Sequence, residues 1–255
     1  MPLASPNSPP GARARAPRRD GRGAIALALL ALACTVGAAR AEAAGAAAPF
    51  SIVALGSSST QGTGASGPSM SYPAQLQRLF EDRYAGHPAV TVLNEGVAGE
   101  DIDETAKRLQ ADVLSRHPDL VIWQTGSNDP LRGVPMDRFQ AELKSGIDAI
   151  RASGAEVLLM EPQWSPVIER ADAKERFVDA VRAVAAQEHV DVVRRFALMR
   201  GWIDGGVITA PELIGSDGLH MTDRGYGLLA RAVLDQIAAQ SPAFRARRSV
   251  AAAKP

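Results

Sequence analysis

The amino-acid sequence predicts an α/β fold in which five parallel strands form one sheet and helices connect them. Short aliphatic runs alternate with longer segments whose apolar residues recur at helical spacing, and this alternation is typical of a parallel sheet with crossover helices. The chain has 255 residues, which suffices for one ordinary domain once non-globular ends are set aside. We therefore expect a single folded domain.

The predicted strands are rich in β-branched and aliphatic residues, as strands buried on both faces are. They span 50–55, 90–93, 120–124, 156–160 and 190–193. Between them, four segments place apolar side chains on one helical face. These four apolar stripes begin at Leu76, Ile102, Phe139 and Phe177. A fifth helix is expected over 222–239, with Thr222 as its N-cap.

The first 41 residues indicate a secretory signal peptide rather than a part of the fold. Five arginines between positions 13 and 22 precede an apolar run, and the small-residue site Ala39-Arg40-Ala41 follows it. Ala41-Glu42-Ala43 is an alternative cleavage site. The uncharged stretch 23–39 is shorter than the about 20 residues of a membrane-spanning helix. We expect a secreted or periplasmic protein without stable membrane insertion after cleavage.

The two ends of the mature chain are expected to be mobile. Residues 42–49 form a small-residue spacer and 241–255 a basic tail without apolar period, which leaves a domain over 50–240. The only cysteine, Cys34, lies in the leader, so the mature chain should hold no disulfide or thiolate metal ligand. Without the leader, 22 basic and 27 acidic residues leave a net charge of −5, which argues against nucleic acid as a partner.

Four polar segments stand where a parallel sheet binds its ligands, at the carboxyl ends of strands or just before the last helix. They are Gly56-Ser57-Ser58-Ser59, Asn94 to Gly99, Gly126-Ser127-Asn128-Asp129 and Asp217-Gly218-Leu219-His220. Each of them taken singly is most often a turn. Their combination along one predicted edge indicates one site.

These four segments resemble the motifs of SGNH hydrolases, the GDSL-type esterases: a G-D-S-like turn, a glycine, G-x-N-D and D-x-x-H, in this order. The resemblance covers essentially the whole domain and implies a flavodoxin-like three-layer α/β/α sandwich that hydrolyses esters. It implies Ser58 as nucleophile, His220 as base and Asp217 as the carboxylate behind the histidine. It also implies an oxyanion hole formed by the N–H groups of Ser58 and Gly99 and by the Asn128 amide.

The chemistry of these residues supports the resemblance. A serine hydroxyl is a weak nucleophile until a base within hydrogen-bond reach removes its proton. Among the four histidines, only His220 lies at the predicted carboxyl edge, and a turn can bring Asp217 to its ring. Gly96 is an alternative to Gly99 as oxyanion donor. One residue departs from the family pattern, because Ser57 stands where an Asp is usual.

Other functional classes fit less well. The nucleophile elbow of an α/β-hydrolase needs glycine two residues after the serine, and Thr60 stands there. No Gly-Lys-Ser/Thr completes a phosphate-binding loop, and we expect neither a metal nor a cofactor. A non-catalytic carbohydrate- or lipid-binding module stays an alternative, as do thioesterase, lysophospholipase and acyltransferase activities within the family. The oligomeric state stays open.

The expected substrates are short acyl esters, acetyl to butyryl, of a small molecule or a polysaccharide. Enzymes that take long acyl chains need a large apolar surface, commonly supplied by an inserted cap, and no predicted loop provides one. The loop 129–135 carries only Leu131 and Val134 as large apolar residues. Trp164 follows the fourth predicted strand, where its ring can bind the substrate or pack against the core.

Overall fold

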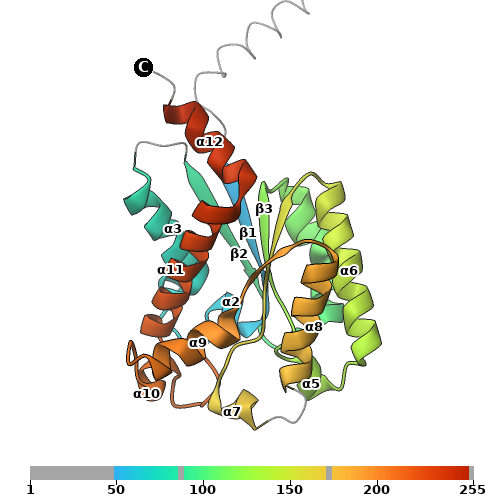
Figure 1. Ribbon diagram of the computed structural model, residues 1–255, viewed down its shortest axis with the longest axis vertical. Helices are drawn as coiled ribbons and strands as arrows, with labels where there is room; N and C mark the ends of the chain where they lie inside the picture. The colour runs from blue at the N-terminus through green and yellow to red at the C-terminus, as the bar shows by residue number, and fades with distance from the viewer. Residues whose placement is uncertain (1–48, 86–88, 171–173, 253–255) are drawn as a thin grey trace, which may run out of the picture. The chain divides into compact units, whose positions relative to one another are not determined.

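The architecture of the chain is given by a computed structural model that describes residues 49–85, 89–170 and 174–252 (Figure 1). The predicted leader, 1–41, and the spacer up to residue 48 lie outside the described residues. A parallel five-stranded sheet with helices on both faces confirms the predicted fold class.

The strand order in the sheet is β2-β1-β3-β4-β5, so that β1 lies between β2 and β3. The five strands are β1 (Phe50–Gly56), β2 (Val90–Gly96), β3 (Leu120–Gln124), β4 (Glu156–Met160) and β5 (Asp191–Val193). In register, Ile52 of β1 pairs with Val92 of β2 and with Leu120 of β3. The chain leaves β1 toward β2 and then returns to the other side of β1, so the order reverses there. Such a reversal opens a crevice at the carboxyl ends of the strands.

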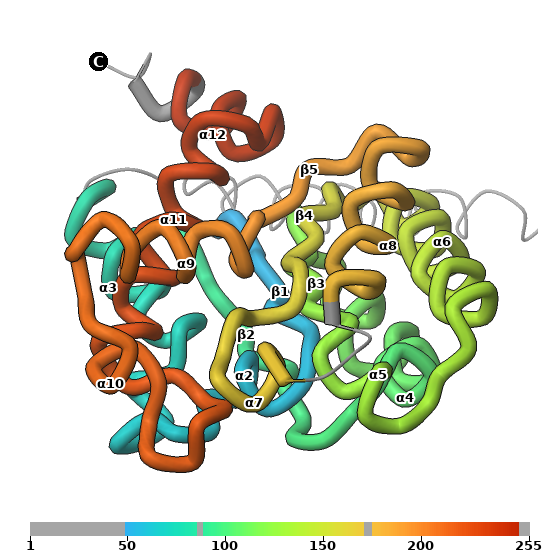
Figure 2. The backbone as a smooth tube through the Cα atoms, turned by 60° about the horizontal axis from the view of Figure 1, so that its bottom comes forward, coloured from blue at the N-terminus to red at the C-terminus, as the bar shows by residue number. Residues whose placement is uncertain are grey.

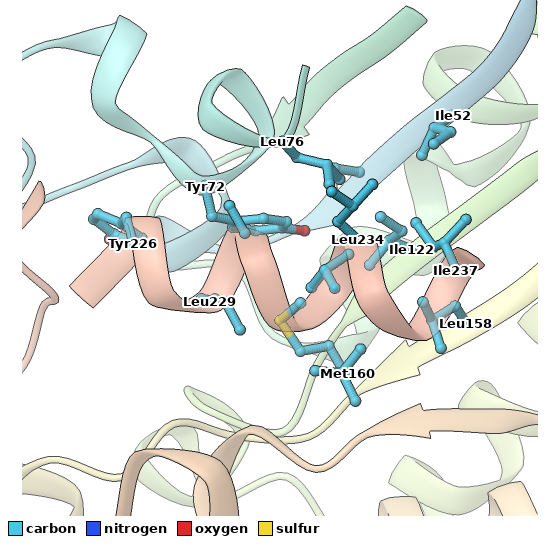
Figure 3. Packing of buried hydrophobic residues seen from close by; sticks show 14 of the residues in the cluster. Ile52, Tyr72, Leu76, Ile122, Leu158, Met160, Tyr226, Leu229, Leu234 and Ile237 are labelled. Carbon is cyan, nitrogen blue, oxygen red and sulfur yellow. The ribbon is translucent and has the colours of Figure 1, made fainter. Parts of the chain in front are cut away.

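One face of the sheet packs against α3 (Tyr72–Arg83) and α11 (Asp223–Gln240). Figure 3 shows this layer: Tyr72, Leu76, Leu234 and Ile237 from the helices lie against Ile52, Ile122, Leu158 and Met160 from the strands. Every one of these eight side chains is buried. Two long helices therefore close this side of the sheet.

The opposite face is covered by α4 (Ile102–Arg108), α6 (Met136–Ala152) and α8 (Lys174–Gln187). Side chains of β1 alternate between the two faces, as a strand requires: Ile52 belongs to the first core cluster and Val53 to the second. The predicted second helix is irregular, because α4 passes into a π-helical turn, η3 (Leu109–Val113), and a 3₁₀ turn, η4 (Leu114–Arg116).

Several short helices have no counterpart in the sequence prediction. Most of them have four residues, too few for an apolar period to be visible. They are α2 (Ser58–Gln61), η2 (Pro68–Met70), α5 (Asp129–Arg132), α7 (Pro166–Glu169), α9 (Arg195–Asp204) and α10 (Ala210–Leu213). Figure 2, which turns the lower end of the molecule forward, shows α2, α5 and α7 grouped around the carboxyl edge of the sheet.

The expectation of a mobile tail over 241–255 is wrong for residues 242–252, which form α12 (Pro242–Ala252). Phe244 is only 3% exposed, and its ring centroid lies 5.4 Å from that of Phe50 and 5.3 Å from that of Tyr84. The carboxylate of Glu156 accepts a hydrogen bond from the N–H of Ala243 at 2.7 Å. One aromatic residue among alanines and arginines produces no periodic signal, so the sequence alone did not indicate this docking.

None of the helices in the described ranges combines the length and the apolarity needed to cross a membrane.

Phe244→Ala should lower the free energy of unfolding by about 3–5 kcal/mol, the usual cost of removing a buried aromatic side chain. Urea unfolding followed by circular dichroism measures the change. Arg245→Ala is the control, because Arg245 is exposed on the same helix and should shift stability by no more than about 0.5 kcal/mol. Equal stability of the two variants would contradict the docking of α12.

Candidate active site

The candidate nucleophile stands at the sharp transition from β1 to α2. Ser57 is the N-cap of α2, and Ser58 is its first residue. The first turn of a helix leaves N–H groups without intrahelical acceptors, so the N–H of Ser58 is available to a ligand. Gly56 is required just before this turn, because a Cβ there would lie 2.7 Å from Oε1 of Gln124. This close contact between Gly56 and Gln124 fixes the backbone direction from the end of β1 into α2, which begins with Ser58.

The structure brings Ser58, His220 and Asp217 together into one chain of hydrogen bonds. Oγ of Ser58 lies 2.9 Å from Nε2 of His220, across 162 residues of sequence. Nδ1 of the same ring lies 2.6 Å from Oδ2 of Asp217. A single bridge between Ile214 and Met221 closes the loop that carries both residues, and this loop leads directly into α11.

The carboxylate of Asp217 is held in its ionised form. Burial raises its pKa, but the N–H of Leu219, the ring of His220 and the N–H of His220 together outweigh burial and lower the pKa to about 2. The two N–H groups donate to Oδ1 at 2.9 and 3.0 Å, which leaves Oδ2 for the imidazole. A carboxylate in this position selects the tautomer in which Nδ1 carries a proton and Nε2 can accept one.

A glycine loop after α2 supports the back of the histidine. Gly64 has φ +89°, and a Cβ on it would lie 2.8 Å from Cβ of His220. The loop is tied to α11, because the hydroxyl of Tyr226 donates to the carbonyl of Thr63 at 2.6 Å. No pattern in the sequence of this segment indicates a contact with the histidine. Its closeness to His220 depends on the tertiary structure.

The loop after β2 distinguishes the two candidate oxyanion glycines. Gly96 packs under the nucleophile turn, where a Cβ would lie 2.1 Å from the backbone nitrogen of Gln61. Gly99 instead lies in the open part of the loop with φ +82°. The N–H of Val97 donates to the carbonyl of Gly56 at 3.0 Å and so ties this loop to the end of β1. The geometry favours Gly99 over Gly96 as a donor to a ligand.

Asn128 joins the loop after β3 to the loop after β2. Its Nδ2 donates to the carbonyl of Glu100 at 2.8 Å, and since an amide carries two such hydrogens, one is left for a ligand. The neighbouring Asp129 accepts from the N–H of Ile102 at 2.9 Å. Burial raises the pKa of Asp129 to about 6, although the N–H of Ile102 opposes that shift. Two hydrogen bonds, at Glu100 and at Ile102, therefore fix the segment after β2 to the segment after β3.

Two buried polar residues beneath the nucleophile were not predicted. Oε1 of Gln124 accepts from the N–H of Ser57 at 2.9 Å, and Nη1 of Arg195 donates to Oγ of Ser59 at 2.8 Å. Gln124 was visible only as the end of a strand, and Arg195 as one of two successive arginines. No sequence pattern distinguishes a buried arginine from a solvated one.

Trp164 lies in the core rather than on an open rim. Its side chain belongs to the cluster between the sheet, α3 and α11, and 8% of it is exposed. The guanidinium of Arg200 lies 5.7 Å from the ring centroid. Packing against the core therefore accounts for its position, and little of the ring is open to a substrate.

The described residues form neither a metal site nor the cavity lined by Leu120, Glu156 and Val190 at this edge. In the part of the chain that the structure describes, no three histidine, cysteine or carboxylate side chains converge as metal ligands would. A cavity of about 340 Å³ lies at the amino end of the sheet, next to Leu120, Glu156 and Val190. It is separated from Ser58 by the length of the strands.

Comparisons with known proteins show which family the chain belongs to. The model of the non-GDSL lipase-like family matches residues 31–241. An arylesterase of Vibrio mimicus is 30% identical over 149 residues, which are 58% of this chain and 70% of the relative. Esterase TesA of Pseudomonas aeruginosa is 30% identical over 156 residues, 60% and 70% of the two chains. An acetylxylan esterase of Geobacillus stearothermophilus is 25% identical over 159 residues, 58% and 72%.

The fold has a solved counterpart in a lipase/acylhydrolase from Enterococcus faecalis. The two share 25% identity and a TM-score of 0.63, over 74% of this chain and 96% of the other. The family match extends over most of the chain and includes all four predicted motif segments. The protein therefore belongs to the non-GDSL lipase-like family of SGNH-type hydrolases and is a carboxylic ester hydrolase.

Proposed function

We propose that the protein is an exported serine esterase that removes short acyl or acetyl groups from a small-molecule or polysaccharide ester. The observation that carries this proposal is the chain of hydrogen bonds from Asp217 through His220 to Ser58, at 2.6 and 2.9 Å. It lies where a parallel sheet of this order binds ligands. The protons that acyl transfer must move can be donated and accepted by these three side chains.

The proposed reaction begins when Oγ of Ser58 attacks the ester carbonyl while Nε2 of His220 takes its proton. Asp217 stabilises the imidazolium that forms. The N–H groups of Ser58 and Gly99 and the amide of Asn128 stabilise the negative carbonyl oxygen. His220 then protonates the leaving alcohol, an acyl group stays on Ser58, and water activated by the same histidine releases the acid.

Export is the second element of the proposal. It is supported by the arginine-rich, apolar and small-residue pattern of 1–41. The exported chain is expected to begin near Glu42, which N-terminal sequencing of protein recovered outside the cytoplasm would test. An intact Met1 on such material would contradict it.

The surroundings of the site favour short acyl groups. Val97, in the loop after β2, and Leu131, in α5 after β3, are the large apolar residues left exposed in these two segments, at 42% and 56%. They can cover a few methylene groups but not a long chain. The acetylxylan esterase among the relatives supports an acetylated carbohydrate as one such substrate.

Ser58→Ala should leave a folded protein whose turnover of p-nitrophenyl acetate falls by about three or more orders of magnitude, as when a triad residue is lost. Circular dichroism verifies the fold. Ser57→Ala is the comparison variant: it removes one buried hydrogen bond to Gln124 and should cost about tenfold at most. An inactive Ser57→Ala beside an active Ser58→Ala would move the nucleophile by one residue.

Asn128→Asp should lower kcat by about 10²- to 10³-fold with little change in KM, because the lost donor acts mainly on the transition state. Aspartate keeps the shape of the side chain but cannot donate when ionised. Steady-state kinetics on one ester measure both constants. A variant that binds substrate poorly yet turns it over at the normal rate would assign Asn128 to ground-state binding.

A series of p-nitrophenyl esters from acetyl to dodecanoyl should give the highest kcat/KM at two to four carbons, since little apolar surface borders the site. Each methylene that enters an apolar channel would add about 0.8 kcal/mol at most. A steady rise toward ten or more carbons would instead favour a thioesterase- or lysophospholipase-like acyl hydrolase.

A further inference from the structure

Arg195 is a buried arginine at the beginning of α9, directly after β5. Its exposed fraction is 0%, and charged side chains are almost never fully buried unless they are hydrogen-bonded. Burial lowers its pKa to about 10, so the guanidinium is still a cation at neutral pH. Such a group is costly to bury, and its contacts indicate what it does there.

The guanidinium contacts both segments that carry the proposed catalytic groups. Nη1 donates to Oγ of Ser59 at 2.8 Å, and Nη2 donates to Oγ of Ser127 at 3.4 Å. Ser59 follows the proposed nucleophile, and Ser127 precedes the proposed oxyanion donor Asn128. One rigid planar group thus spans the turn after β1 and the loop after β3. The third contact, from Nε to the carbonyl of Glu161 at 3.0 Å, anchors Arg195 to the end of β4.

Gln124 makes a second connection between the same two segments. Its Oε1 accepts from the N–H of Ser57 at 2.9 Å, and its Nε2 donates to Oγ of Ser127 at 3.3 Å. Gln124, Arg195, Ser57, Ser59 and Ser127 form what we call the sub-nucleophile cluster. All five side chains are buried, where water does not readily replace a lost hydrogen bond.

The guanidinium of Arg195 donates its hydrogen bonds to uncharged oxygen atoms. The three hydrogen bonds above all go to hydroxyl or carbonyl groups. The carboxylate of Glu161 is hydrogen-bonded instead to Arg182, at 2.7 and 3.0 Å, and to the N–H of Phe196. Position 57, where an Asp is usual, is a serine and adds no carboxylate to the cluster.

We propose that Arg195 is a positioning residue for ester cleavage, which fixes Ser58 and Asn128 relative to each other through the hydroxyls of Ser59 and Ser127. The proposal rests on the proposed function. A misplacement of reacting groups by about 1 Å can cost 10²-fold in rate. Rigid bridging of this kind is suited to the planar fork of arginine and not to the point charge of lysine.

The first test compares Arg195→Met, Arg195→Lys and the control Arg182→Met. Arg182 binds the same buried Glu161 from α8 without a hydrogen bond to Ser59 or Ser127 among the described contacts. We expect Arg195→Met to lower kcat by about 10²-fold with KM changed less than about threefold, and Arg195→Lys to restore only part of the loss. Arg182→Met should lose stability while kcat per active site stays within about twofold.

Two readouts separate this proposal from the proposed function. Turnover of p-nitrophenyl acetate is normalised to sites titrated with a fluorophosphonate, and the rate of labelling of Ser58 by that probe is measured independently. A wild-type protein that is labelled but cleaves no ester would overturn the proposed function, and the labelling rates of the variants would still test Arg195. A folded Arg195→Met with wild-type kcat and labelling rate would overturn the positioning role.

A double-mutant cycle covers the case in which Arg195→Met does not fold. Ser59→Ala and Ser127→Ala each remove one acceptor of the guanidinium, and each should lower kcat on its own. Combined with Arg195→Lys, either should add less than its separate loss, because the lysine variant has already weakened the interaction. Losses that multiply fully would show that Arg195 acts independently of the two hydroxyls and would overturn the proposal.

Discussion

The internal position of β1, hydrogen-bonded to β2 on one side and to β3 on the other, determines where the candidate site can form. Because all three strands are parallel, their carboxyl ends lie at one edge and release three loops next to one another. Direct hydrogen bonds then link the loops in pairs: Val97 to Gly56, Asn128 to Glu100, and Ser57 to Gln124. The site is thus a continuation of the sheet rather than a separate structure placed on it.

Two carboxylates at this edge behave differently because their surroundings differ. Asp217 accepts several hydrogen bonds and has its pKa lowered to about 2, whereas burial raises that of Asp129 to about 6. In the unfolded chain an aspartate titrates near 3.9. Folded Asp129 therefore keeps a proton that the unfolded chain loses, and its contribution to stability is present below about pH 4 and lost as the pH rises through about 6. Asp217 contributes in the opposite direction: its contribution is present above about pH 4 and lost as the pH falls through about 2.

The sequence predicts most of what depends on local pattern. The five strands show as aliphatic runs, and Ser58, Asp217 and His220 show as short motifs at strand ends and before a helix. Their meeting in space agrees with those motifs, while their catalytic roles stay predictions. Phe244 and Arg195 could not be predicted, because burial of one aromatic or one arginine depends on contacts more than a hundred residues away. Short helices such as α2 and α7 depend on tertiary contacts, and in α7 also on the Ser165 cap, rather than on periodicity.

The docking of α12 determines which face of the enzyme stays accessible when the enzyme is immobilised through an end of the domain. Phe244 contacts Phe50 at the beginning of β1, and Arg247 pairs with Asp119 just before β3. Both ends of the described domain thus meet at the amino edge of the sheet, while Ser58 lies at the carboxyl edge (Figure 1). A carrier protein, resin or electrode coupled through either end of this domain would hold it with the edge of the candidate site turned outward, so that immobilised enzyme keeps this edge accessible to bulky or insoluble substrates.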